Sequence, residues 1–213
     1  MSVKIQKFEF NPFAENTYVL YDDSLQCVII DPGCSNHCEN SMLQNFIQEN
    51  KLTPVEVWLT HAHVDHIAGL QHICDYYKIG FVSHKSDEHL LKQATIIGRL
   101  YGINIEEPGS PLRYFEDGDT AIFGETKFHV AFTPGHCPGE VCLINHESRF
   151  VIAGDVLFRE SIGRTDLPGG NFEQLSHSIQ TKLFCLPDDY KVYCGHGLET
   201  TIGHEKKYNP FLN

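Results

Sequence analysis

Four potential metal ligands stand close together in the segment Thr60-His61-Ala62-His63-Val64-Asp65-His66, directly after an apolar run. Side chains two residues apart point the same way in an extended chain, so His61 and His63 can converge on one metal ion. We expect a helix to begin near Asp65, bringing Asp65 and His66 to a second metal and aiming its positive end at the site. A solvated polar loop with chance histidines is the competing interpretation, and the buried strand before the cluster argues against it.

Three further potential ligands, each preceded by glycine, end other apolar runs of the chain. They are His136 after Phe132-Thr133-Pro134-Gly135, Asp155 after Val151-Ile152-Ala153-Gly154, and His196 after Val192-Tyr193-Cys194-Gly195. In α/β proteins, ligand sites form beyond the carboxyl ends of strands, and glycine lets the backbone approach a crowded centre closely. One such residue alone would be ordinary, but several strand ends that each deliver a ligand indicate a shared metal centre.

Hydrophobic periodicity predicts a mixed α/β chain that forms one domain over residues 1–213. Segments 16–21 and 26–30 form a hairpin through the turn at 22–24, and the stretch 106–119 reads as irregular. We expect helices at 39–50, 65–77, 86–101 and 171–184, and further strands at 55–60, 79–83, 120–123, 126–132, 141–145, 149–153 and 190–194. This alternation indicates sheets covered by helices.

The bulk composition limits the classes of function. A net charge of -12 makes nucleic acid a poor partner, although bound metals would reverse the local field around a small anionic substrate. The N-terminal residues MSVKIQKFEF lack the apolar core of a signal peptide. No run of about 18 apolar residues is present, so we expect no membrane span. We therefore expect a cytoplasmic protein whose 8 cysteines are reduced.

The order HxHxDH, followed by His136, Asp155 and His196, resembles the metallo-β-lactamase fold superfamily over nearly the whole chain. The resemblance implies an α/β protein (α+β in some schemes) folded as a four-layer αββα sandwich. It also implies that His61, His63 and His136 bind a first metal, that Asp65, His66 and His196 bind a second, and that Asp155 bridges the two. Two Zn²⁺ ions per chain are expected, and such donors also accept Fe or Mn.

Other motifs are similar to those of hydroxyacylglutathione hydrolases (glyoxalase II). They are Asn11-Pro12-Phe13, the segment Thr133-Pro134-Gly135-His136-Cys137-Pro138-Gly139, and the loop Gly163-Arg164-Thr165-Asp166. Full-length members carry a helical C-terminal region that supplies glutathione-binding groups. This chain ends 17 residues after His196, so it resembles the short bacterial branch, and we expect no separate C-terminal glutathione-binding domain.

The resemblance implies a metal-dependent hydrolase acting on a small-molecule thioester such as S-lactoylglutathione. We expect hydroxide held by the metals to be the nucleophile, with Asp65 as the catalytic residue that orients it. A thiolate leaves readily, because thiols have a pKa of about 8.5, so no dedicated general acid is needed. Arg164 either contacts the substrate or forms a structural salt bridge with Asp166.

Other functions remain in competition with this one. A persulfide dioxygenase would use a single iron held by two histidines and one aspartate, whereas the full set of seven ligands favours a hydrolase. A β-lactamase is disfavoured because the best-known groups carry cysteine where this chain has Asp155. A binding module without catalysis predicts missing ligands, and none is missing. Cys34, His37 and Cys38 form either a further metal site or a loop with free thiols.

Overall fold

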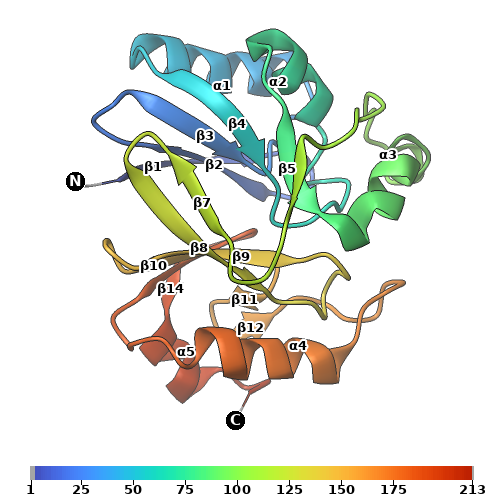
Figure 1. Cartoon of the computed structure of the whole chain (residues 1–213). Coiled ribbons are helices and arrows are strands. Elements are labelled where there is room, and N and C mark those ends of the chain that lie inside the picture. The colour runs from blue at the N-terminus through green and yellow to red at the C-terminus, as the bar shows by residue number, and fades with distance from the viewer. Residues whose placement is uncertain (1–2, 213) are drawn as a thin grey trace.

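Two mixed sheets packed face to face form the centre of the computed structural model, which describes residues 3–212 (Figure 1). The first sheet has the order β1-β2-β3-β4-β5-β6, with bounds Lys4–Phe10, Glu15–Tyr21, Gln26–Ile30, Thr53–Trp58, Phe81–His84 and Arg113–Phe115. The second has the order β14-β13-β10-β9-β8-β7, with bounds Thr200–Thr201, Lys191–Cys194, Phe150–Gly154, Val141–Asn145, Thr126–Phe132 and Thr120–Phe123. A short pair, β11 (Leu157–Phe158) and β12 (Ser161–Ile162), stands apart from both sheets.

Helices cover the outer face of each sheet. The first sheet is covered by α1 (His37–Glu49), α2 (Leu70–Tyr77) and α3 (Glu88–Leu100), and the second by α4 (Phe172–Ser178) and α5 (Ile202–Tyr208) (Figure 1). This arrangement confirms the predicted αββα layering of an α/β protein. In the described part of the chain, no helix is long and apolar enough to cross a lipid bilayer.

The central strands are apolar on both sides because each side meets a different layer. Leu20 and Val28 belong to the core between the sheets, whereas Val19 and Ile29 pack in the core under the helices of the first sheet. Successive side chains of a strand point to opposite faces, so a continuous apolar run fills both cores. The same division on β10 places its carboxyl end, and Asp155 after it, between the layers.

Several elements differ from the sequence-based expectation. The stretch 106–119 contains β6, which pairs in parallel with β5, and the helix expected at 171–184 changes at Ile179–Leu183 into a π-helical turn. Strand β1 and helix α5 were not expected. The β1 sequence KIQKFEF is mostly exposed or half-buried, so it lacks a strong apolar signal and is held by antiparallel pairing with β2.

The helix expected from residue 65 begins at Leu70 instead. Residues 64–69 form turns because their backbone groups are bound elsewhere. The Gly69 N–H donates to the Pro32 carbonyl, and the Asp65 carbonyl accepts from the Asn11 side-chain amide, so the Gly69-to-Asp65 helical hydrogen bond is absent. The helix therefore begins four residues after His66, and Asp65 and His66 reach the site from a turn.

Candidate metal centre

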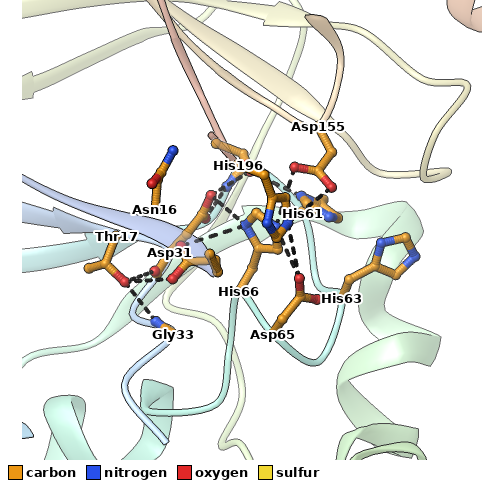
Figure 2. A network of polar contacts seen from close by, with 12 residues as sticks. Asn16, Thr17, Asp31, Gly33, His61, His63, Asp65, His66, Asp155 and His196 are labelled. Carbon is orange, nitrogen blue, oxygen red and sulfur yellow. Dashed lines mark hydrogen bonds and ion pairs between the residues drawn. The ribbon is translucent and has the colours of Figure 1, made fainter. Parts of the chain in front are cut away.

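The seven predicted ligands meet at one edge of the sandwich, where strands of both sheets end. His61 and His63 follow β4, and Asp65 and His66 lie in the turns before α2. The other three leave the second sheet, with His136 after β8, Asp155 after β10 and His196 after β13. Figure 2 shows the side chains of Asp65, His66, Asp155 and His196 pointing toward one another, with Asp31 beside His66.

The predicted ligands other than Asp155 form two groups of three donors, and Asp31 completes a third group with His61 and His66. One group is His61, His63 and His136 and the other is Asp65, His66 and His196, with the donor atoms of each within 4.8 Å of one another. Asp155 Oδ1 lies 3.4 Å from His66 Nε2, and its Oδ2 lies 3.5 Å from His136 Nε2. One carboxylate thus faces both groups, which is the arrangement that two neighbouring metal ions require of a bridging ligand.

The chemistry of the donors fits divalent metal ions. His61 Nε2, His66 Nε2 and Asp155 Oδ1 are buried, and no hydrogen-bond partner for them exists among the described residues. Each buried unpaired polar atom costs about 1–3 kcal/mol, so such atoms in both donor groups call for cations. Imidazole and carboxylate donors together suit Zn, Fe or Mn. The role of each residue as a ligand stays a prediction.

Burial keeps two of the histidines neutral, whereas at His66 and His196 the nearby carboxylates outweigh burial and raise the pKa. Burial lowers the pKa of His61, and it lowers the pKa of His63 to about 4, so both rings are neutral at pH 7. Burial opposes ionisation of Asp155, but His66, His196 and His136 outweigh it and hold its pKa far below the ordinary value. The Asp155 carboxylate is therefore negatively charged wherever the protein is folded.

A surrounding layer of acceptors holds four of the five histidine rings in place, because each of the four presents one nitrogen to the centre and the other to the protein. This layer tunes ligand orientation and basicity. The contacts are His66 Nδ1 with Asp31 Oδ2 at 3.1 Å, His61 Nδ1 with Glu140 Oε1 at 3.6 Å, His136 Nδ1 with the Arg164 carbonyl at 2.7 Å, and His196 Nδ1 with the Phe13 carbonyl at 3.0 Å. Sequence reasoning missed these contacts.

Asp87 is a further buried carboxylate that sequence reasoning missed. Its Oδ2 accepts from the Ala62 N–H at 2.9 Å, between His61 and His63, and its Oδ1 accepts from Cys137 Sγ at 3.1 Å. The Gly139 N–H also donates to this carboxylate. Asp87 therefore joins the loop after β4 to the loop after β8, and Cys137 is a buried structural thiol beside the centre.

Two glycines are needed where the second sheet meets the centre. A Cβ on Gly195 would lie 2.2 Å from Asp155 Oδ1 and 2.8 Å from His66 Cε1. Gly154 has a φ of +50°, and a Cβ there would lie 2.5 Å from Thr60 Oγ1. These contacts confirm the expected close approach of the backbone at the ligand-bearing strand ends.

A cavity of about 530 Å³ opens on the centre. Five of the seven predicted ligands reach its wall. The rest of the wall comes from the loop after β4, α3, the loop before β2, the short pair β11 and β12, and the loop after β12. Arg164 lines this cavity, but its guanidinium forms a two-point ion pair with Asp166 at 2.7 and 2.8 Å. The expected salt bridge between Arg164 and Asp166 is thus present, and contact of Arg164 with the substrate stays a prediction.

The second metal site considered around Cys34 and Cys38 does not form. Cys34 is buried in the core, whereas Cys38 is exposed. Within residues 3–212, no cluster of three metal-type donors includes either thiol. The eight cysteines described are all free thiols.

The profile of the metallo-beta-lactamase superfamily matches residues 10–196. The chain belongs to the metallo-β-lactamase superfamily. Within that superfamily it is 39% identical over 212 residues to the probable metallo-hydrolase YqgX of Bacillus subtilis, covering 99% of this chain and 98% of the relative. It is 35% identical over 213 residues to the hydroxyacylglutathione hydrolase GloC of Haemophilus influenzae, covering 99% of each.

Solved structures of the superfamily share the fold closely. The B3 metallo-beta-lactamase BLEG-1 aligns with a TM-score of 0.91 and 36% identity, covering 99% of this chain and 100% of that one. TTHA1623 in a di-iron-bound form aligns with a TM-score of 0.87 and 36% identity, covering 97% and 100%. The chain is therefore a member of a metallo-hydrolase family, with a His and Asp centre suited to divalent metals.

Proposed function

We propose that this chain is a binuclear metal-dependent hydrolase of thioesters, of the hydroxyacylglutathione hydrolase type. The observation that carries the proposal is the pair of three-donor groups with the Asp155 carboxylate between them, facing an open cavity. Similarity to GloC over 99% of both chains supports the reaction type. When bound, a pair of divalent metals activates water at neutral pH and polarises a carbonyl oxygen.

The chain's own residues position the reactants. The first group, His61, His63 and His136, and the second, Asp65, His66 and His196, would each hold one metal, with Asp155 facing both. The Asp65 carboxylate lines the cavity, with Oδ2 3.2 Å from His196 Nε2. It can accept a hydrogen bond from the attacking water and orient it toward the substrate carbonyl. The departing thiolate needs no proton, because a thiol has a pKa of about 8.5.

The metal pair is proposed to be Zn²⁺, and iron is the alternative, supported by the similarity to TTHA1623, which was solved in a di-iron-bound form. Elemental analysis of the purified protein, paired with hydrolysis of S-lactoylglutathione, tests metal and reaction together. About two metals per chain with thioester turnover would support the proposal. One iron per chain, no thioester turnover and O₂ uptake with glutathione persulfide would replace it with the dioxygenase.

Hydrolysis of β-lactams is the second candidate, because the B3 metallo-beta-lactamase BLEG-1 aligns with this chain with a TM-score of 0.91. The leaving nitrogen of a β-lactam needs a proton, which a leaving thiolate does not. A chromogenic cephalosporin in the same assay separates the two reactions. A kcat/KM for the cephalosporin above that for the thioester would favour the lactamase.

A further inference from the structure

The cavity beside the predicted metal centre has a largely apolar wall on the side of α3, where His89 and Gln93 are the polar lining residues. Leu90 and Ile97 of α3, and Tyr101 just after it, stand on one side of the helix. Phe13 meets Tyr101 edge to face, with ring centroids 5.9 Å apart, although it comes from the loop between β1 and β2. Leu167 continues the apolar lining from the loop after β12. A substrate group that extends from the predicted metal centre toward α3 therefore meets a surface that is mostly hydrocarbon.

Among its described lining residues, the cavity offers no unpaired arginine or lysine to a charged substrate, and His89 and Gln93 are the polar side chains that α3 contributes. Among the described residues of its wall, Arg164 is the single arginine or lysine, and its guanidinium is already paired with Asp166. Both side chains of that pair are exposed, so the pair is screened by water and is a weak anchor for another anion. Glutathione carries two carboxylates that each need a donor. The chain's net charge of -12 also repels such a ligand beyond the metals.

We infer that this protein hydrolyses uncharged thioesters with an apolar acyl group in preference to glutathione conjugates. The inference rests on the proposed thioesterase function and adds its substrate class. Leu90, Ile97 and Tyr101 determine the preference, because they form a single stripe along α3 that the acyl group contacts. Each methylene group buried against such a wall favours binding about fourfold.

The same helix supplies a matched control for this wall. Ile97 lines the cavity, whereas its neighbour Ile96 does not and is 65% exposed. Ile97→Asn places an amide against the substrate, and Ile96→Asn makes the same chemical change facing solvent. Neither Ile96 nor Ile97 is itself a predicted metal ligand.

The experiment compares three substrates with the metal-loaded protein. They are hexanoyl-N-acetylcysteamine, lactoyl-N-acetylcysteamine and S-lactoylglutathione. We expect kcat/KM for the hexanoyl compound to exceed that for each lactoyl compound by at least about tenfold. Ile97→Asn should reduce this ratio by about tenfold, while Ile96→Asn leaves it unchanged. A ratio measured within one variant does not depend on how much of that variant folds.

Outcomes separate this inference from the proposed function. Thioester turnover with a ratio below tenfold, or a ratio that Ile97→Asn leaves unchanged, would overturn the substrate class while the thioesterase stands. No turnover of any of the three by protein with two metals bound would overturn the thioesterase itself. Binding of the thioether S-hexyl-N-acetylcysteamine, which the enzyme cannot hydrolyse, can be measured by calorimetry and tests contact with the apolar wall without turnover. Burial of its chain predicts a negative heat-capacity change, smaller in Ile97→Asn, and absence of binding would overturn the apolar cleft.

Discussion

At the scale of single residues, the predicted metal centre depends on Asp87, a carboxylate that is not itself a predicted ligand. Asp87 accepts hydrogen bonds from Ala62, Cys137 and Gly139, in the two loops that carry His61, His63 and His136. Burial raises the pKa of Asp87 above its ordinary value, and these donors oppose that rise. The Asp87 side chain holds together the two loops that carry these predicted ligands. It therefore affects metal binding by positioning the histidines and not by contact with a metal.

Replacing Asp87 tests this positioning role. Asp87→Ala leaves three donors unpaired, and we expect a loss of about 1–3 kcal/mol in the free energy of unfolding. We also expect metal affinity to fall about 10- to 100-fold, as for other residues that orient ligands. Denaturant unfolding and metal competition with a chelating dye measure the two effects. Glu88→Gln, at a partly exposed neighbouring carboxylate paired with Lys92, is the control and should change both very little.

At the scale of elements, the strand ends of the second sheet deliver ligands through tight glycine turns. The turn after β13 brings the Gly195 backbone against Asp155, and the Gly195 N–H donates to the Gly154 carbonyl at 2.7 Å. The Asn16 N–H in turn donates to the Gly195 carbonyl at 2.7 Å, which joins β2 of the first sheet to this turn. The turn therefore sets the position of both Asp155 and His196.

Gly195→Ala should disrupt the centre directly. The new Cβ would lie 2.2 Å from Asp155 Oδ1, so the carboxylate or the turn must move. We expect metal affinity to fall by about tenfold or more, measured by equilibrium dialysis. Gly109→Ala is the comparison, because its Cβ would meet only Gln71 Oε1 at an ordinary 3.5 Å. Equal metal binding by Gly195→Ala and Gly109→Ala would contradict the tight turn.

Asp22 joins the hairpin between β2 and β3 to the hairpin between β7 and β8. Its carboxylate accepts from Ser24 in its own turn, and from the Glu125 N–H and Thr126 Oγ1 of the other sheet, each at 2.8 Å. Burial opposes ionisation of Asp22, but these hydrogen bonds outweigh it and hold its pKa below the ordinary value. The carboxylate thus links the two sheets far from the metal centre.

A lowered pKa has a defined consequence for stability. The contribution of Asp22 is present above its unfolded pKa of about 3.9 and is lost as pH falls through the folded pKa. Asp22→Asn should therefore lower the free energy of unfolding by about 1–3 kcal/mol at pH 7. The difference from the unchanged protein should shrink below about pH 4. Urea unfolding across pH measures it, with the exposed Asp23→Asn as control, and a difference that grows toward acid pH would contradict the assignment.

At the scale of the whole molecule, the predicted ligands come from both sheets, so metal binding ties the two halves of the sandwich together. His61 and His66 follow strand β4 of the first sheet, and Asp155 and His196 follow strands of the second. Metals that bind only the folded protein stabilise it by about 4.1 kcal/mol at 1,000 times the Kd. The metal contribution is therefore a large share of the usual stability of a domain.

Removing the metals should lower the melting temperature. A protein of this size loses about 2–4 °C per kcal/mol, so chelation of tightly bound metals should lower Tm by about 10 °C. Calorimetry before and after treatment with a chelator measures the shift, and adding Zn²⁺ back should restore it. Glu199→Gln, an exposed change outside the predicted ligands, should show the same shift. A Tm that chelation leaves unchanged would contradict the predicted ligand set.

Much of the site was predictable from local sequence because each ligand stands at a recognisable place. An apolar run, a glycine and a histidine or aspartate mark the ends of β8, β10 and β13, and HxHxDH marks the end of β4. Alternate side chains face opposite layers in a strand, so these runs also predicted most strands and the layered fold. The periodicity of α3 predicted that helix without revealing which face lines the cavity.

The tertiary structure alone decided which distant groups support the centre and what shape surrounds it. Asp31, Asp87 and Glu140 are single carboxylates with no local pattern, and their roles depend on contacts across long stretches of chain. The start of α2 also depended on a distant partner, since the Pro32 carbonyl takes the Gly69 N–H. Local sequence predicted the candidate ligands because strand ends are local features, whereas buried hydrogen bonds and cavity walls form only when separate segments pack together.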